Sequence, residues 1–197
     1  MELDIRRLAP DMLEDYLFFF DNVAFADHKE WANCYCMHFH SYDGIEAEFK
    51  AYESSGKTGF VREKASQFIK EGIIRGYLAY YNSRVAGWCS ANDKQNYSAL
   101  KNNVSPDLWT DDINRKIKSL VCFLIAPDMR GRSVSARLLE RVCADAETDG
   151  YECVEAYPVM GGFDMYAAHR GTAEFFGKRG FVIHRQSENG GVMRKYL

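Results

Sequence analysis

An unbroken apolar run leads into a basic turn and then an amphipathic segment, and this succession constrains the fold more than any other stretch. The run SLVCFLIA, residues 119–126, carries no charged side chain, which is typical of a central strand covered on both faces. From residue 134 apolar residues recur at helical spacing, and Gly150 follows as a C-terminal cap, so a helix is expected there. A buried strand followed closely by a helix predicts an α/β fold.

The rest of the chain alternates between strand and helix patterns. Two β-rich runs around Asn82-Ser83 predict a hairpin from Tyr77 to about Ala91. The polar stretch 92–117 is expected to be irregular, with a short helix toward its end. Further strands are expected at 3–8 and 152–158, helices after Pro10 and over 58–72, and a short helix with a second hairpin over 171–197. We predict one mixed α/β domain over residues 1–197.

The composition argues against several classes of protein. Lys and Arg number 25 against 28 Asp and Glu, a formal net charge of -3 that is too balanced for sequence-independent binding to nucleic acid or an anionic membrane. No run approaches the ~20 apolar residues of a membrane helix, and the N-terminal residues show no signal-peptide pattern. We therefore expect a cytoplasmic protein with no membrane or nucleic-acid partner, whose six scattered cysteines stay reduced.

The turn between the central strand and its helix is a candidate anion site. Backbone N–H groups at a helix N-terminus favour anions, and Arg130 and Arg132 add positive charge, so a pyrophosphate would suit the turn. The alternative is a solvated turn in which Ser133 only caps the helix. The stretch lacks both G-x-x-x-x-G-K-[ST] and G-x-G-x-x-G, so the usual nucleotide-binding loops are not supported.

Two stretches resemble motifs of one superfamily. VCFLIAPDMRGRSVSARLLERVCADAETDGYECVEAYPV, residues 121–159, is similar to the acetyl-CoA-binding motif of the GNAT acetyltransferases, and AEFFGKRGF, residues 173–181, is similar to their second motif. The resemblance implies the GNAT acyl-CoA N-acyltransferase fold, a mixed, mostly antiparallel sheet flanked by helices with splayed central strands. It also implies acetyl-CoA as co-substrate and acetyl transfer to a primary amine of a small molecule or peptide by direct attack.

The resemblance also places the co-substrate. In the family the pantetheine arm pairs with the main chain of the central strand, and the pyrophosphate lies on the following turn. The matching positions here are Phe123, Leu124 and Ile125 on the strand and Arg130, Gly131, Arg132, Ser133, Val134, Ser135 and Ala136 at the turn. Ser133 and Ser135 replace the usual glycine and glycine-or-alanine. Each adds a Cβ where main chain approaches phosphate, which weakens binding if φ there is positive. In a helical first turn, by contrast, serine is allowed and its hydroxyl can donate to phosphate or cap the helix, so we expect binding to survive.

The proton-transfer groups depart from the family pattern. Ser119 stands where some relatives carry a base glutamate, so Glu155 on the next strand is the candidate general base; the alternative is a glutamate that simply pairs with an arginine. Phe176 replaces the usual acid tyrosine. Tyr157 and Tyr166 are the candidate general acids, with packing as their alternative role and water as an alternative proton donor.

The segment NCYCMHFH, residues 33–40, combines thiols with imidazoles. An extended conformation spreads Cys34 and His40 ~20 Å apart, too far for one four-ligand ion, and a helix would leave only i,i+4 pairs. We expect no metal there, and we interpret Cys122 as a core thiol rather than an acyl carrier. The segment lies where the family shapes its acceptor pocket, so the expected acceptor-binding residues are Trp31, Tyr35, His38 and His40.

Two hypotheses remain at the level of sequence. The first is an acetyl-CoA-dependent N-acetyltransferase. The second is a GNAT-like module that binds acyl-CoA as a sensor or structural ligand without turnover, which the altered turn and the missing acid would suit. The enzyme is favoured because positioning and amide polarisation supply much of the rate in such a reaction. A homodimer is the ordinary expectation for a small soluble enzyme.

Overall fold

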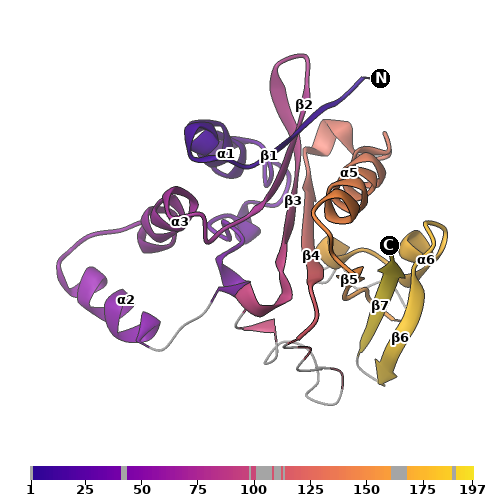
Figure 1. Ribbon diagram of the computed structural model, residues 1–197. Helices are drawn as coiled ribbons and strands as arrows, with labels where there is room; N and C mark the ends of the chain where they lie inside the picture. Colours follow the sequence, from indigo (N-terminus) through magenta and orange to yellow (C-terminus); the bar gives the residue numbers. More distant parts are fainter. Residues whose placement is uncertain are drawn as a thin grey trace.

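The computed structural model describes residues 2–40, 44–97, 99–100, 108, 112, 114–160, 168–187 and 190–197. Within them a seven-stranded sheet runs in the order β1-β2-β3-β4-β5-β7-β6, with helices on both faces (Figure 1). The strands are β1 (Asp4–Arg7), β2 (Gly76–Tyr81), β3 (Arg84–Asp93), β4 (Ile117–Ile125), β5 (Cys153–Ala156), β6 (Val182–Ser187) and β7 (Gly190–Tyr196). The helices are α1 (Leu13–Asn22), α2 (Ile45–Ser54), α3 (Phe60–Lys70), α5 (Val134–Thr148) and α6 (Ala173–Gly177).

The predicted mixed, mostly antiparallel sheet is confirmed. Strands β4 and β5 pair in parallel, and the other described strand pairings are antiparallel. The hairpin β2–β3 turns at Asn82 and Ser83, whose φ values of 50° and 61° are the left-handed pair that a two-residue turn needs. Asparagine tolerates this conformation better than most residues, which is why the dipeptide was informative.

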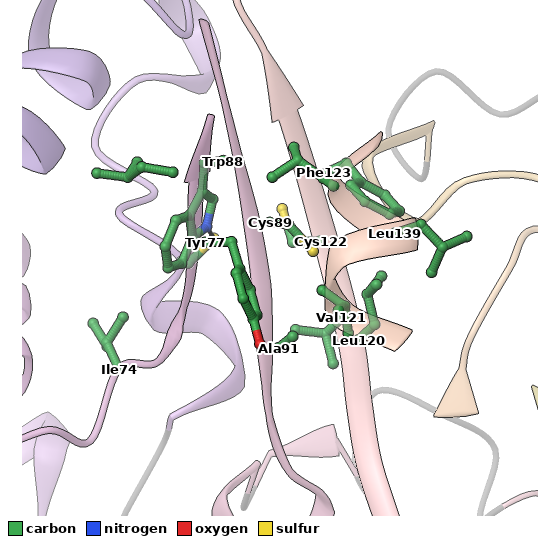
Figure 2. Close-up of a cluster of buried hydrophobic side chains, with 14 of the residues drawn as sticks. Ile74, Tyr77, Trp88, Cys89, Ala91, Leu120, Val121, Cys122, Phe123 and Leu139 are labelled. Carbon is green, nitrogen blue, oxygen red and sulfur yellow. Dashed lines mark hydrogen bonds between the residues drawn. The ribbon is translucent and has the colours of Figure 1, made fainter. Parts of the chain in front are cut away.

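Helices α1 and α3 cover one face of the sheet, and α5 covers the other (Figure 1). Successive residues of a strand point to opposite faces, so β3 contributes to both layers. On one side Trp88 packs edge-on against Tyr16 of α1 with ring centroids 5.0 Å apart; on the other, Leu139 of α5 closes the core (Figure 2). The central strands are therefore largely apolar on both faces, as their sequence predicts, apart from a few buried polar residues such as Asn92 and Ser119.

Helix α2 was not predicted. It has no buried residue, unlike α1, α3 and α5. It is held instead by its neighbour: Lys64 Nζ of α3 lies 2.7 Å from Glu48 Oε2, and the rings of Phe49 and Phe60 meet edge-on. A few tertiary contacts with α3, rather than burial in the core, therefore hold this helix.

Strands β4 and β5 separate before β4 ends. Residues Ile117–Leu120 pair with Cys153–Ala156, whereas β4 continues to Ile125. On the other side of β4, Ser90 pairs with Cys122 and Ala91 with Leu120, so Val121 is an extra residue in a β-bulge. The bulge coincides with the end of the β4–β5 ladder. The splay leaves the β5-side main chain of residues 121–125 without a described strand partner, as the family resemblance led us to expect.

In the part of the chain that the structure describes, no helix has the length and apolar character needed to cross a bilayer.

Candidate functional site

A cavity of about 630 Å³ lies beside the free edge of β4. Three parts of the chain enclose it: the end of β4 with the start of α5, the segment 24–39 that follows α1, and residues 168–175. Its described lining consists of Ala24, Phe25, His28, Trp31, Cys34, Cys36, His38, Phe39, Cys122, Phe123, Leu124, Ile125, Arg130, Ser135, Ala168, His169, Gly171 and Phe175. The cavity is thus mainly apolar, with its polar groups at few positions.

Five of the ten residues expected to bind the co-substrate line this cavity. They are Phe123, Leu124, Ile125, Arg130 and Ser135. The other five belong to the same turn and helix start without lining the cavity: Gly131, Arg132 and Ser133 are exposed, and Val134 and Ala136 are buried in the core. A helix leaves its first amides without acceptors of its own, so α5 presents donors at this end of the cavity.

The turn before α5 has the backbone that the family motif implies for glycine. Gly131 has φ 73° and Ser133 has φ 61°. A non-glycine residue in this left-handed region carries a conformational cost on the order of 1 kcal/mol. Ser133 makes no side-chain capping hydrogen bond to α5, so the interpretation of this residue as an ordinary helix cap is not supported.

Arg130 is held by an acidic partner from the facing segment. Its Nη1 and Nη2 donate to the carboxylate of Asp27, with Nη2 3.2 Å from Oδ1. The hydrogen bond from Arg130 lowers the pKa of Asp27 below its ordinary value. Both side chains are partly exposed, so water screens the pair and a stronger anion can displace the carboxylate.

The segment 24–39 forms the wall opposite β4 and has an irregular backbone. Asn33, Tyr35 and Cys36 all have positive φ, between 41° and 72°. Such conformations persist where surrounding contacts over-determine them, and here Trp88 Nε1 donates to Cys36 Sγ at 3.0 Å. The segment is neither the extended strand nor the helix that we considered from the sequence.

Two of the four predicted acceptor residues, Trp31 and His38, line the cavity. Tyr35 and His40 do not line it, because their side chains are buried elsewhere. Tyr35 donates its hydroxyl to Asp21, and the His40 ring packs against those of Phe68 and Tyr97. Burial lowers the pKa of His40 to about 4. Within these irregular turns, sequence spacing did not fix which way a side chain points.

The cavity also contains residues that the sequence reasoning missed. His28 and His169 line it, as do Phe25 and Phe175. The His28 ring stacks on Trp31 with centroids 4.2 Å apart, and its Nδ1 lies 3.0 Å from Glu30 Oε1. The only sequence signal for His28 was its place shortly before Trp31, which we had assigned to the acceptor pocket.

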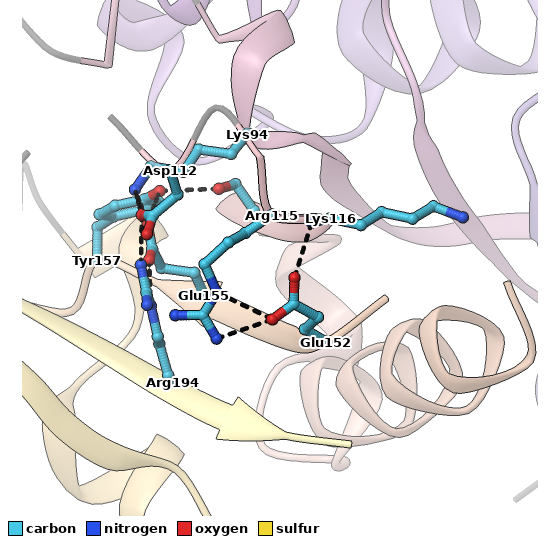
Figure 3. Close-up of polar contacts among 9 residues, drawn as sticks. Lys94, Asp112, Arg115, Lys116, Glu152, Glu155, Tyr157 and Arg194 are labelled. Carbon is cyan, nitrogen blue, oxygen red and sulfur yellow. Dashed lines mark hydrogen bonds and ion pairs between the residues drawn. The ribbon is translucent and has the colours of Figure 1, made fainter. Parts of the chain in front are cut away.

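Glu155, the predicted base, lies outside the described lining of the cavity, in a buried ionic network (Figure 3). Its Oε2 accepts from Arg194 Nε at 2.6 Å, and its Oε1 lies 3.1 Å from Lys94 Nζ. Both cations also contact Asp112 Oδ2, at 2.7 Å and 2.9 Å. Two cations and two carboxylates neutralise each other, so the arginine-pairing alternative describes Glu155 better than the catalytic one.

Tyr157 belongs to the same network. Its hydroxyl donates to Glu155 Oε1 at 2.5 Å and lies 2.8 Å from Ser119 Oγ, which must then be the donor to Tyr157. Burial raises its pKa well above the ordinary value, and the ring does not line the cavity. These contacts do not support Tyr157 as the acid. Tyr166 lies outside the described residues, and Phe176 is fully buried in the core.

Three thiols, those of Cys34, Cys36 and Cys122, line the cavity. The pKa of Cys36 is raised well above its ordinary value by its hydrogen bond to Cys122 and by burial. A thiol that stays protonated is a poor nucleophile, so Cys122 and Cys36 are unsuited to act as acyl carriers. In the described ranges, no group of three or more His, Cys, Asp or Glu side chains is arranged to hold a metal ion.

Comparison with known proteins identifies the class. The family model "Acetyltransferase (GNAT) family" matches residues 41–181. The chain therefore belongs to the GNAT acetyltransferase family. A search of curated proteins by sequence gave no match.

Solved structures of low sequence identity share the fold. A GNAT acetyltransferase from Listeria monocytogenes is 13% identical with a TM-score of 0.60, over 100% of this chain and 96% of that one. The polyamine N-acetyltransferase of Drosophila melanogaster is 10% identical with a TM-score of 0.57, and the PaiA N-acetyltransferase of Thermoplasma acidophilum, in complex with coenzyme A, is 15% identical with a TM-score of 0.53. Both cover 100% of each chain. At these identities the comparison extends to the fold alone.

Proposed function

We propose that this protein is an acetyl-CoA-dependent N-acetyltransferase that acetylates a primary amine of a small molecule or peptide by direct attack. The observation that carries the proposal is the free edge of β4, residues 121–125, which runs beside a cavity and into the turn at Arg130. The two features suit the two ends of the co-substrate: an amide-rich pantetheine arm and an anionic pyrophosphate.

The residues present fit acetyl-CoA by their chemistry. Main-chain N–H and C=O groups of β4 that have no strand partner among the described residues can pair with the pantetheine amides, as an added strand would. Arg130 and the first amides of α5 can hold the pyrophosphate once Asp27 releases the guanidinium. We assign Phe123–Ile125, Arg130 and Ser135 to direct contact and the remaining turn residues 131–134 and 136 to shaping the turn.

In the proposed reaction the neutral amine nitrogen attacks the thioester carbonyl carbon, a new C–N bond forms, and the C–S bond breaks. A main-chain N–H of the free β4 edge can donate to the oxyanion as it develops. The acylated nitrogen loses a proton, and water passes a proton to the departing CoA thiolate, since Phe176 has none to give. Positioning in the cavity supplies the rest of the acceleration.

We assign the general base to His28. It lines the cavity, and Glu30 accepts from its Nδ1, which fixes the tautomer and leaves Nε2 to take the ammonium proton of the acceptor. Glu155 was the earlier candidate, but its two oxygens already serve Arg194, Lys94 and Tyr157. Its carboxylate is fully buried and does not belong to the described lining of the cavity.

The first test is calorimetric titration with acetyl-CoA of the wild-type protein, of Arg130→Glu and of Arg115→Glu. Arg115 is paired with Glu152 near the start of β4, away from the cavity, and serves as the matched charge control. We expect wild type and Arg115→Glu to bind alike and Arg130→Glu to lose about a hundredfold in affinity or more. Equal binding by all three would remove the co-substrate from this turn.

The second test separates an enzyme from a binding module. Release of CoA thiol is followed over a panel of amines, with His28→Asn against His184→Asn, a histidine of β6 outside the cavity lining. We expect His28→Asn to lower kcat by roughly a hundredfold and to leave the acetyl-CoA Kd unchanged. Binding with no amine-dependent release would favour the non-catalytic acyl-CoA module.

A further inference from the structure

The wall of the cavity opposite β4 carries no carboxylate among its described residues. It comes from the segment 24–39, and its side chains are three aromatic rings, two imidazoles, two thiols and one alanine: Phe25, Trp31, Phe39, His28, His38, Cys34, Cys36 and Ala24. With the co-substrate on the β4 side, this wall and the lining residues of the segment 168–175 remain for the acceptor. It offers aromatic area rather than negative charge.

The acidic residues in and just before this segment are engaged elsewhere. Asp21 lies 3.0 Å from Arg62 Nη2, and Glu30 accepts from His28. Asp27 pairs with Arg130 in the free protein, and the proposed pyrophosphate site would release it. None of the three lines the cavity. The chain thus has carboxylates nearby, and the fold directs them to partners other than the acceptor.

This arrangement discriminates between classes of amine. A polyamine carries several ammonium groups, and each one taken from water into an apolar site costs several kcal/mol unless a carboxylate meets it. A monoamine gives its single excess proton to the base before attack and enters the reaction neutral. Its apolar remainder gains about 25 cal/mol for each Å² removed from water, and a ring can stack on the Trp31–His28 pair.

We propose that the acceptor is a primary monoamine carried on an aromatic or similarly apolar group, and not a polyamine. The inference rests on the proposed function, because it assigns the β4 side of the cavity to acetyl-CoA. It selects one acceptor chemistry within a family whose members differ in what they acetylate. Trp31 is the specificity-determining residue of this assignment.

The experiment compares 2-phenylethylamine with spermidine in two measurements on the full chain. Calorimetry measures the binding of each amine to the protein saturated with CoA, and thiol release from acetyl-CoA measures kcat/KM for each. We expect 2-phenylethylamine to exceed spermidine by at least about tenfold in both. Trp31→Ala should lower kcat/KM for 2-phenylethylamine about tenfold with the acetyl-CoA Kd unchanged, while Phe49→Ala, an exposed aromatic of α2, should change neither.

The outcomes separate the two levels of the argument. Two results would overturn the monoamine assignment and leave the co-substrate site standing. One is a preference for spermidine, and the other is equal binding and turnover of the two amines by a protein that still binds acetyl-CoA. Turnover of 2-phenylethylamine that Trp31→Ala does not alter would remove the acceptor from this wall and overturn the inference as well. Failure of acetyl-CoA itself to bind would overturn the proposed function, and the acceptor assignment with it.

Discussion

The buried ionic network and the cavity handle charge in opposite ways. In the network, Glu155 and Asp112 are matched against Lys94 and Arg194 within 3.1 Å, and Glu155 and Arg194 are fully buried. In the cavity, the described lining has one permanent charge, Arg130, whose partner Asp27 lies partly in solvent. The first arrangement is closed to any ligand, whereas the second can exchange its partner.

The difference shows why carboxylates alone were a poor guide to the candidate site. Asn92, Ser119, Glu155 and Arg194 stand in register on four neighbouring strands, so the network is a polar row across the sheet. A row of this kind must be satisfied internally, because unpaired buried charge is costly. A catalytic group needs the reverse arrangement: a polar atom that no protein group occupies and that faces a space open to the substrate.

The largest effect is expected from Glu155→Gln. It leaves two buried cations against one carboxylate, so we expect the free energy of unfolding to fall by about 3 to 5 kcal/mol, measured by urea denaturation. Glu152→Gln, in an exposed pair with Arg115, is the matched control and should cost no more than about 1 kcal/mol. A folded Glu155→Gln with wild-type stability and abolished turnover would return Glu155 to the catalytic role.

The next effect concerns His40, on the core side of the segment that lines the cavity. Burial lowers its pKa to about 4, so between pH ~6.5 and 4 the unfolded chain binds a proton at this residue and the folded protein does not. The stability this provides is complete above pH ~6.5 and is lost as pH falls toward 4, a loss on the order of 3 kcal/mol. Denaturation of wild type and His40→Asn from pH 7 to 4 measures it; parallel pH profiles for the two proteins would contradict it.

A smaller effect is expected from releasing Arg130. Asp27→Asn removes both a competitor for the guanidinium and a negative charge beside the proposed anion site, so acetyl-CoA should bind about three- to tenfold more tightly by calorimetry. Asp21→Asn, which unpairs Arg62 instead, should leave the affinity unchanged. Weaker binding by Asp27→Asn would mean that Asp27 positions Arg130 rather than competing for it.

The smallest effect has opposite signs at two serines of one turn. Ser133 has φ 61°, so Ser133→Gly should raise the free energy of unfolding by roughly 0.5 kcal/mol, the relief of strain exceeding the entropy that glycine adds to the unfolded chain. Ser135 lies within α5, where Ser135→Gly should lower it by a similar amount. The two variants measured side by side by thermal unfolding test the backbone assignment; changes of equal sign would refute it.

The sequence by itself determined the strand–turn–helix at residues 117–148, the β2–β3 hairpin and the mixed sheet. These depend on local patterns, such as an unbroken apolar run, helical spacing and a turn dipeptide suited to positive φ, that the folded protein retains. The same patterns carried the family motif and with it Phe123–Ile125, Arg130 and Ser135.

Only the tertiary structure decided which side chains face the cavity. Trp31 and His38 turn inward while Tyr35 and His40 turn to the core, because positive φ at Asn33, Tyr35 and Cys36 breaks the simple periodicities on which sequence reasoning depends. The register of β4, β5 and β7 places Glu155 beside Ser119 and Arg194. No local sequence pattern encodes this relation among three distant residues. Long-range pairing and irregular backbone thus decided the polar chemistry, since both depend on contacts between distant parts of the chain.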